Sequence, residues 1–266
     1  MNNNVEKLIN EAVNNMIKHT SSDKKINKLI KKHDKKVHFI PKKYRIFGGV
    51  LQSLNIQFGN FIEELMEVII ANDDRYEIVK KYSGKKSNKF KISSSNESLI
   101  DNYITRCQTE SDFALETEFI KLINSIINDN GSNTIEFKHD IDLLFKDKNT
   151  GIYYYLEIKY EDNHDTGKFI DINRKFIKTS AYLINELKID NIDMFKPILF
   201  FFNNRKMKGN IYIPENTNIY RGKRFFDEYL NINYDEVEQY MLNLSENDST
   251  IKMFNELYDK VMNYKK

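Results

Sequence analysis

The sequence predicts a mixed α/β fold in which helices flank a central sheet. Apolar residues recur at helical spacing over residues 59–72. Residues 140–160 then change to a period of two, and their two short apolar runs, separated by a turn at 149–151, predict a β-hairpin. A helical pattern over about 170–187 follows, and the apolar run 198–202 is typical of a buried strand. This order of helix, hairpin, helix and strand indicates a mixed α/β protein.

The elements before the hairpin are expected to be mostly helical. Residues 1–36 have weak helical periodicity, and Pro41 and the Gly48-Gly49 pair then interrupt it. Residues 82–98, rich in Ser, Lys and Asn, are expected to form a loop, and a helix is expected over about 112–128.

The rest of the chain completes one domain. A further strand is expected at 210–214. Because no repeat or clear linker divides the chain, we expect a single domain over residues 1–266. It would consist of a helical N-terminal arm of about 1–40, a core of about 44–230 and C-terminal helices of about 231–266.

Composition indicates a folded cytoplasmic protein. Of the 266 residues, 40% are apolar and 30% are charged, and no apolar run approaches the length of a membrane span. The first residues, MNNNVEKLIN, lack the pattern of a signal peptide. The one cysteine, Cys107, has no partner for an intramolecular disulfide or for a zinc site. A structural metal and a membrane location are therefore not expected.

Positive charge is unevenly distributed, although 41 Lys and Arg nearly balance 39 Asp and Glu. Residues 24–45 read KKINKLIKKHDKKVHFIPKKYR, and KKYSGKKSNKF, which begins at Lys80, carries five lysines and no acid. Smaller basic clusters lie at 205–208 and 221–224. Such segments either form solvated faces or contact nucleic acid, and a site that acts on a polyanion would favour the second interpretation.

Three charged residues stand in the predicted hairpin where a buried strand would carry none: Asp142, Glu157 and Lys159. Because side chains of a strand alternate between its two faces, Glu157 and Lys159 point the same way. Antiparallel pairing can bring Asp142 close to Glu157. Two converging carboxylates form an oxygen-rich site suited to Mg²⁺. The lysine balances their charge without metal, and beside a metal it can orient or deprotonate a water molecule.

This arrangement fits metal-assisted hydrolysis of a phosphodiester. A glycosidase would also use two carboxylates, but it has no evident need of the lysine. An exposed hairpin with a cross-strand salt bridge would produce the same short pattern.

The segments around these residues favour the catalytic interpretation. DIDLLF, YLEIKY and NHDTGKFIDINRKFIKT resemble the PD-(D/E)xK nuclease superfamily, and within it the HinfI-like type II restriction endonucleases; YRIFGGVLQSLNIQFGNFIEELM and IYRGKRFFDEYL support the resemblance. It implies a restriction endonuclease-like core and Mg²⁺-dependent cleavage of double-stranded DNA by a homodimer. The DNA site would be a short palindrome, interrupted in the manner of GANTC, and a cognate methyltransferase would protect it.

The resemblance also implies residue roles. Asp142 and Glu157 would bind metal, and Lys159 would serve the attacking water. Ile141 stands where the motif has proline, which leaves Asp140 as a rival to Asp142; we favour Asp142 because it lies deeper in the strand.

Other residues are candidates for the same site. Such nucleases often add a glutamate from a preceding helix, and Glu63 fits that role best, with Glu118 as the rival. His164 could assist the site or contact a phosphate. Candidate DNA contacts are Lys85, Lys86, Lys168, Arg174, Lys175 and Lys178, although the last four lie on one helix and cannot all face the same way. Gln52, Ser53 and Asn55 could touch bases or end a turn.

Two other functions remain open at this stage. A repair or recombination nuclease would recognise DNA structure instead of sequence, and a DNA-binding protein without activity would retain the acidic pair as a vestige. The intact Asp, Glu and Lys argue against the second. The apolar positions Leu8, Ile9, Val13 and Ile17 are candidates for a dimer interface or for an ordinary core contact.

Overall fold

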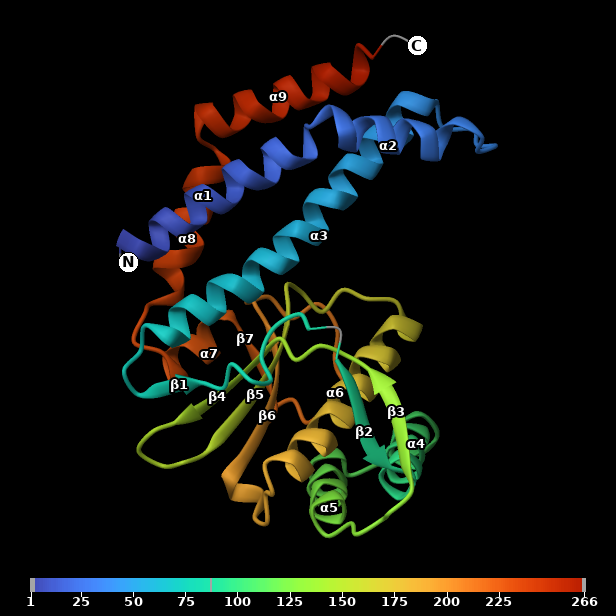
Figure 1. The fold of residues 1–266 in the computed structure, drawn as a ribbon, viewed down its shortest axis with the longest axis vertical. Coiled ribbons are helices and arrows are strands. Elements are labelled where there is room, and N and C mark those ends of the chain that lie inside the picture. Colours follow the sequence, from blue (N-terminus) through green and yellow to red (C-terminus); the bar gives the residue numbers. More distant parts are fainter. Residues whose placement is uncertain (1–2, 87, 265–266) are drawn as a thin grey trace. The chain divides into compact units, whose positions relative to one another are not determined.

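The computed structural model describes residues 3–86 and 88–264, which divide into two compact units. The helical unit contains residues from 1–69 and 232–266, and the sheet unit contains residues 70–231 (Figure 1). The helical unit thus extends to residue 69 and includes the C-terminal helices, whereas the expected helical arm of about 1–40 stays a prediction. The single nuclease domain over 1–266 stays a prediction.

The described residues of the helical unit form α1 (Asn3–Thr20), α2 (Asp23–Asp34), α3 (Lys42–Ala71), α8 (Tyr234–Ser245) and α9 (Asp248–Met262). One of its apolar clusters joins Ile26, Leu29 and Ile30 of α2 to residues of α3 and α9. In α1, Ile9 and Ile17 are buried within the chain, which is the core contact expected as the alternative to a dimer interface. None of the helices in the described part of the chain is long and apolar enough to cross a membrane.

The predicted break at Gly48-Gly49 is wrong, because α3 runs through both glycines. A Cβ atom at Gly49 would lie 3.0 Å from Leu29 Cδ2, so glycine permits close packing of α2 on α3. Pro41 stands directly before α3, where the missing N–H is not needed, and its carbonyl accepts hydrogen bonds from the first turn. The interruption therefore lies between α2 and α3.

A five-stranded mixed sheet forms the centre of the sheet unit, in the order β1-β4-β5-β6-β7. Its strands are β1 (Tyr76–Ile78), β4 (Leu143–Asp147), β5 (Tyr153–Lys159), β6 (Phe195–Phe201) and β7 (Ile219–Arg221). β4 pairs antiparallel with both β1 and β5, whereas β6 pairs parallel with β5 and β7 pairs parallel with β6. The predicted hairpin, the buried strand near 198–202 and the mixed α/β class are confirmed.

Helices cover both faces of this sheet. The helices that contact the sheet are α6 (Thr166–Glu186) and α7 (Gly222–Tyr229), whereas α4 (Ser94–Thr109) and α5 (Leu115–Ile127) pack against α6, and a short 3-10 helix spans Ile192–Met194. On β5, Tyr155 stacks on Phe176 of α6, while its neighbour Tyr154 contacts Tyr229 of α7, both with ring centroids 5.4 Å apart. Because successive strand residues face opposite sides, α6 and α7 pack on opposite faces (Figure 1). The predicted helices near 112–128 and 170–187 are confirmed as α5 and α6.

The expected loop at 82–98 is wrong, since β2 (Lys89–Ser93) pairs antiparallel with β3 (Thr134–Lys138) as a separate ribbon. Phe90 and Ile92 are buried on one face of β2, while Lys89 and Lys91, which alternate with them, are exposed. Phe90 stacks on Tyr182 of α6, with ring centroids 4.1 Å apart. This packing orders a lysine-rich segment that composition alone assigns to a loop.

The expected strand at 210–214 is also wrong. The Asn210 carboxamide oxygen accepts hydrogen bonds from the N–H groups of Tyr212 and Ile213, at 2.8 and 3.1 Å. An Asn side chain that bonds the following backbone in this way forms a turn, which competes with strand pairing. The last strand is β7 instead.

Candidate active site

The carboxyl end of β5 lies at an opening in the sheet. Its antiparallel ladder with β4 ends at the pair Leu143–Leu156, whereas its parallel ladder with β6 continues to Lys159–Phe201. On the edge of β5 that β4 no longer covers, the Ile158 N–H donates a hydrogen bond to the Asp142 carboxylate at 2.7 Å. The strand alternation then places Glu157 and Lys159 beside Asp142 at this opening.

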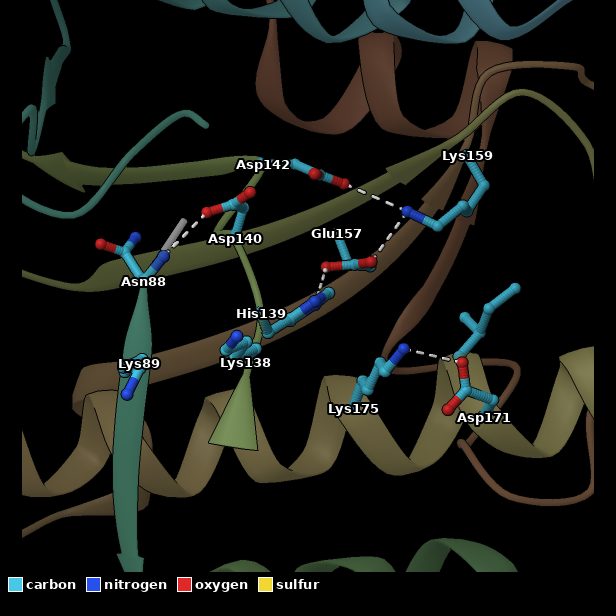
Figure 2. Close-up of a pocket in the computed structure, with 11 residues that line it drawn as sticks. Asn88, Lys89, Lys138, His139, Asp140, Asp142, Glu157, Lys159, Asp171 and Lys175 are labelled. Carbon is cyan, nitrogen blue, oxygen red and sulfur yellow. Dashed lines mark hydrogen bonds and ion pairs between the residues drawn. The ribbon is translucent and has the colours of Figure 1, made fainter. Parts of the chain in front are cut away.

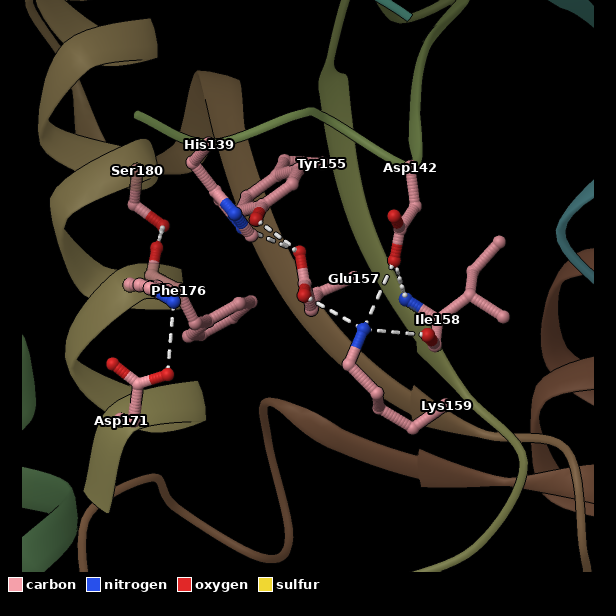
Figure 3. Close-up of polar contacts among 10 residues, drawn as sticks. His139, Asp142, Tyr155, Glu157, Ile158, Lys159, Asp171, Phe176 and Ser180 are labelled. Atoms are coloured by element: carbon pink, nitrogen blue, oxygen red, sulfur yellow. Dashed lines mark hydrogen bonds and ion pairs between the residues drawn. The ribbon is translucent and has the colours of Figure 1, made fainter. Parts of the chain in front are cut away.

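The Lys159 ammonium lies between the two carboxylates (Figure 3). Its Nζ atom is 2.8 Å from Glu157 Oε1 and 3.2 Å from Asp142 Oδ2, and it donates a third hydrogen bond to the Ile158 carbonyl at 2.7 Å. Three oxygen atoms, two from β5 and one from the residue directly before β4, therefore converge on one cation. The structure brings together the three residues that the sequence predicted to form a site; their catalytic roles stay predictions.

Glu157 is buried and its second oxygen is occupied as well. Oε2 accepts a hydrogen bond from the Tyr155 hydroxyl at 2.7 Å and lies 3.2 Å from His139 Nε2 (Figure 3). Burial opposes ionisation, but the Lys159 charge and the His139 contact outweigh it and hold the pKa of the Glu157 carboxyl at about 2. Glu157 is therefore a carboxylate at neutral pH, held on both oxygens.

Lys159 is the cationic partner in this pair. Burial lowers the pKa of its ammonium, but Asp142 and Glu157 together raise that pKa above its ordinary value. Lys159 is therefore protonated in this state and balances the two acids. It can act as a base only when something else neutralises the carboxylates.

Asp140 points away from this network. Its Oδ1 atom accepts hydrogen bonds from the backbone N–H groups of Lys86 and Asn88, at 3.1 and 3.2 Å (Figure 2). Asp140 thus ties the segment before β2 to the segment that carries Asp142. Of the two aspartates that the sequence left open, Asp142 is the one in contact with Lys159.

A cleft of about 580 Å³ gives access to the acids. It is lined by Asn88, Lys89, Lys138, His139, Asp140, Asp142, Glu157, Lys159, Asp171, Ile172 and Lys175 (Figure 2). Lys89 and Lys138 are exposed at the end of the β2-β3 ribbon, and Lys175 pairs with Asp171 on α6 at 2.9 Å. Cations therefore surround the acidic centre, as a phosphate-binding cleft requires.

The predicted DNA contacts divide into two groups. Lys175 lines the cleft, and Lys85 and Lys168 are exposed outside it. In contrast, Lys178 pairs with Glu97 at 2.5 Å and Arg174 with Asp101 at 3.0 Å. Both carboxylates belong to α4, so these two cations fasten α4 to α6 in this structure.

Lys86 is only partly available to DNA. Its ammonium donates hydrogen bonds to the backbone carbonyls of Lys80 and Lys81, the latter at 3.1 Å. The side chain is thereby folded back onto its own segment, although it is exposed to solvent.

Of the two predicted helix glutamates, Glu118 belongs to the same unit as the cleft and does not line it. Glu118 on α5 pairs with Arg106 and Lys121 at 2.8 and 2.7 Å, an exposed network on the helical layer. Glu63 lies on α3 in the helical unit, and its catalytic role stays a prediction.

The remaining candidates lie elsewhere. His164 does not line the cleft; its pKa is lowered by burial and then by Lys168 and Lys159. Gln52, Ser53 and Asn55 lie within α3, so the turn suggested for them is absent there.

Sequence reasoning missed two partners of Glu157. His139 and Tyr155 hold its Oε2 atom, one from the segment after β3 and one from β5. Tyr155 was visible as the residue two before Glu157 on the same strand face. His139 gave no comparable signal, because its position depends on β3, which the sequence pattern did not predict.

The site offers two carboxylates and a backbone carbonyl. Within residues 3–86 and 88–264, no cluster of three or more His, Cys, Asp or Glu side chains is arranged as a metal centre. The oxygen atoms that could hold a cation are those that converge on Lys159 Nζ.

Comparison with known proteins identifies the family of this chain. A family model described as type II restriction endonuclease, HinfI, matches residues 1–245. The curated type II restriction enzyme HinfI from Haemophilus influenzae is 58% identical over 262 residues, which cover 98% of this chain and 99% of that enzyme. No solved structure is significantly similar to the chain. The resemblance noted in the sequence motifs is thereby confirmed over nearly the whole length, and the chain belongs to the HinfI family of type II restriction endonucleases.

Proposed function

We propose that this protein is a type II restriction endonuclease that uses Mg²⁺ to hydrolyse phosphodiester bonds at a short palindrome in double-stranded DNA. The observation that carries the proposal is the convergence of Asp142, Glu157 and Lys159 at an open sheet edge, inside a cleft with a basic rim. Membership of the HinfI family supports the same reaction.

The residues present fit Mg²⁺, which prefers oxygen ligands and keeps several of its waters. Asp142 Oδ2, Glu157 Oε1 and the Ile158 carbonyl already surround one positive charge, the Lys159 ammonium. These three groups would hold the ion. When bound, Mg²⁺ would neutralise charge on the scissile phosphate and make water a better nucleophile.

Lys159 would change its role with the charge state of the acids. Without a divalent ion, its ammonium compensates Asp142 and Glu157, whose charges raise its pKa. Once those charges are neutralised, the main cause of the raised pKa weakens, and Lys159 can orient or deprotonate a water molecule. His139 and Tyr155 meanwhile keep Glu157 Oε2 fixed, so that Oε1 stays directed at the site.

The basic rim would bind the polyanion. Lys89, Lys138 and Lys175 line the same cleft as the acids and can contact phosphates beside the scissile one. We also propose a homodimer, because a two-fold symmetric DNA site is cut on both strands most simply by two identical active sites. A GANTC-like interrupted palindrome and a protecting methyltransferase complete this proposal.

Plasmid digestion tests the reaction. We expect discrete fragments from the wild type with Mg²⁺ and intact DNA in EDTA. Asp142→Asn should lose cleavage, whereas Asp171→Asn, which removes a carboxylate from the same cleft but not from the Lys159 network, should retain it. Nicking that follows DNA structure would indicate a repair nuclease, and a mobility shift without cutting would indicate a binding protein; either result contradicts the proposal.

Sedimentation tests the oligomeric state separately. With a duplex that carries one site, saturating protein should give two subunits for each duplex. One subunit for each duplex would contradict the homodimer and leave the cleavage reaction untouched.

A further inference from the structure

Positive charge is concentrated in residues 24–45, here called the basic segment. It contains ten Lys and Arg and one acid, Asp34. The other 244 residues contain 31 Lys and Arg against 38 Asp and Glu. Outside the basic segment, acidic residues therefore outnumber basic ones. The excess of positive charge belongs to the basic segment and is not a general property of the chain. A merely solvated surface would interleave both signs, as the remainder of the chain does.

The structure fixes part of this charge on one surface of a helix. Ile26, Leu29 and Ile30 of α2 are buried in the apolar cluster with α3 and α9. The exposed lysines of α2 occupy the remaining positions: Lys24, Lys28, Lys31 and Lys32. Because the apolar face is packed, these lysines are presented to solvent by an ordered helix and not by a loose tail.

Few acids compensate these cations. Lys42 pairs with Asp34, which is the one acid in the sequence of the basic segment. The neighbouring cations affect His33, which lies within the same segment. Burial lowers the pKa of His33, and the neighbouring cations Lys36, Arg45 and Lys32 lower it further. The positive charge around His33 thus contributes to its lowered pKa.

We propose that the basic segment is a second DNA-contact surface, which binds the sugar-phosphate backbone without sequence preference and consists of residues other than those of the cleft. The inference rests on the proposed function, since it assumes that DNA is the substrate. Charge complementarity selects this partner, because phosphate contacts release counterions and supply most non-specific affinity. The surface would hold the enzyme on DNA that lacks its recognition site.

Val37 and Phe39 are almost fully exposed in the connection after α2, at 103% and 93%. Figure 1 shows this blue segment projecting beyond the end of α2. Apolar side chains among cations suit insertion into a DNA groove, but they would also suit an anionic lipid surface. The test therefore includes lipid vesicles.

The experiment measures DNA binding by the full chain without divalent ions, on a labelled duplex that lacks the recognition site. Lys28, Lys31 and Lys32 are replaced together by Gln, which preserves helix propensity. The slope of log affinity against log salt should fall by about 0.9 for each phosphate that the variant no longer neutralises, and thus by up to about 2.7. An unchanged slope overturns the inference.

A matched variant replaces Lys7, Lys188 and Lys252 by Gln, which removes the same charge from positions outside the basic segment. Its slope should remain that of the wild type; an equal fall in both variants would indicate a net-charge effect and overturn the inference. Binding to phosphatidylglycerol vesicles that disappears in the first variant, with an unchanged DNA slope, would assign the surface to lipid instead. Circular dichroism melting should be the same for all three proteins.

The two proposals can fail separately. A wild type that cuts plasmid at discrete sites but shows no change of slope in the first variant overturns this inference alone. A wild type that never cuts DNA rejects the proposed function, while the slopes still decide whether the basic segment binds DNA.

Discussion

Replacing Lys159 with Ala should destabilise the protein as well as stop cleavage. Glu157 is buried, and its pKa of about 2, against an ordinary 4.5, corresponds to about 3 kcal/mol at neutral pH, at about 1.4 kcal/mol for each pH unit. The Lys159 ammonium is the largest of the interactions that produce this lowering. Breaking a buried ion pair by removing one partner costs about 3–5 kcal/mol, in agreement with that figure.

The destabilisation should depend on pH in a defined direction. In the wild type the pKa of Glu157 is depressed, so its contribution to stability is present above pH 4.5 and is lost as the pH falls through about 2. Without Lys159, burial would raise the pKa of Glu157, and protonation on acidification would relieve the unpaired charge. The difference in the free energy of unfolding between wild type and variant should therefore shrink between pH 7 and pH 4.

Calcium should partly restore the variant. A divalent ion no longer competes with the ammonium for the three oxygen atoms, and at a hundred times its Kd it would add about 2.7 kcal/mol. The wild type should gain less stability from Ca²⁺ than the variant does. Cleavage with Mg²⁺ should nevertheless fall by about 10² to 10⁴, the usual effect of a general acid or base.

Denaturant unfolding at several pH values, with and without Ca²⁺, measures these effects. Lys175→Ala is the control, because its ion pair with Asp171 is largely exposed and should contribute about 0–1 kcal/mol. Equal stability of wild type and Lys159→Ala at pH 7, or a difference that does not vary with pH, would refute the reasoning about the buried pair.

Two further predictions concern residues that hold the site in place. His139→Leu should lower kcat at saturating DNA by removing the hydrogen bond to Glu157 Oε2, and His139→Gln, which can still donate, should recover much of it; equal rates for both variants would contradict a positioning role. Asp140→Ala should release the backbone N–H groups of Lys86 and Asn88 and raise KM for DNA, whereas Asp140→Asn keeps an acceptor oxygen and should stay near the wild type. Steady-state kinetics separates the two parameters, and an unchanged KM in Asp140→Ala would show that the tether is dispensable.

The hairpin and its charged residues were predictable because their causes are local. A period of two, a turn at Asn149–Gly151 and charges inside apolar runs are all contained in about twenty residues. The expected proximity of Asp142 to Glu157 agrees with the observed register, in which Leu143 pairs with Leu156. The alternating faces of β5 then placed Glu157 and Lys159 side by side, as the structure shows.

The elements that sequence reasoning missed depend on distant partners. The sequence of β2 is typical of a lysine-rich loop, but in the structure Phe90 stacks on Tyr182, which is ninety-two residues further along the chain. The Gly48-Gly49 pair indicates a helix break by its composition, but in the structure Gly49 lies within α3, where Leu29 packs closely against it. Tertiary contact overrides propensity in both cases, so a local pattern cannot reveal either feature.

The choice between Asp140 and Asp142 illustrates how the missed ribbon shapes the site. On the sequence alone the two aspartates differ only by their depth in a predicted strand. In the structure, two backbone N–H groups of the segment before β2 donate hydrogen bonds to the Asp140 carboxylate. The Asp142 carboxylate instead accepts a hydrogen bond from the Ile158 N–H and pairs with the Lys159 ammonium.

The network around Glu157 limits how this site can bind a cation. Tyr155 and His139 occupy Oε2, so Oε1 is the oxygen that remains directed at Lys159. A cation that replaced the ammonium would therefore meet one oxygen from Glu157, one from Asp142 and the Ile158 carbonyl, and would rely on water and phosphate for its other ligands. An ion bound there would have positions left for the substrate phosphate and the attacking water. The hydrogen bonds to Oε2 would then serve the proposed reaction by keeping Glu157 from binding the ion through both of its oxygens.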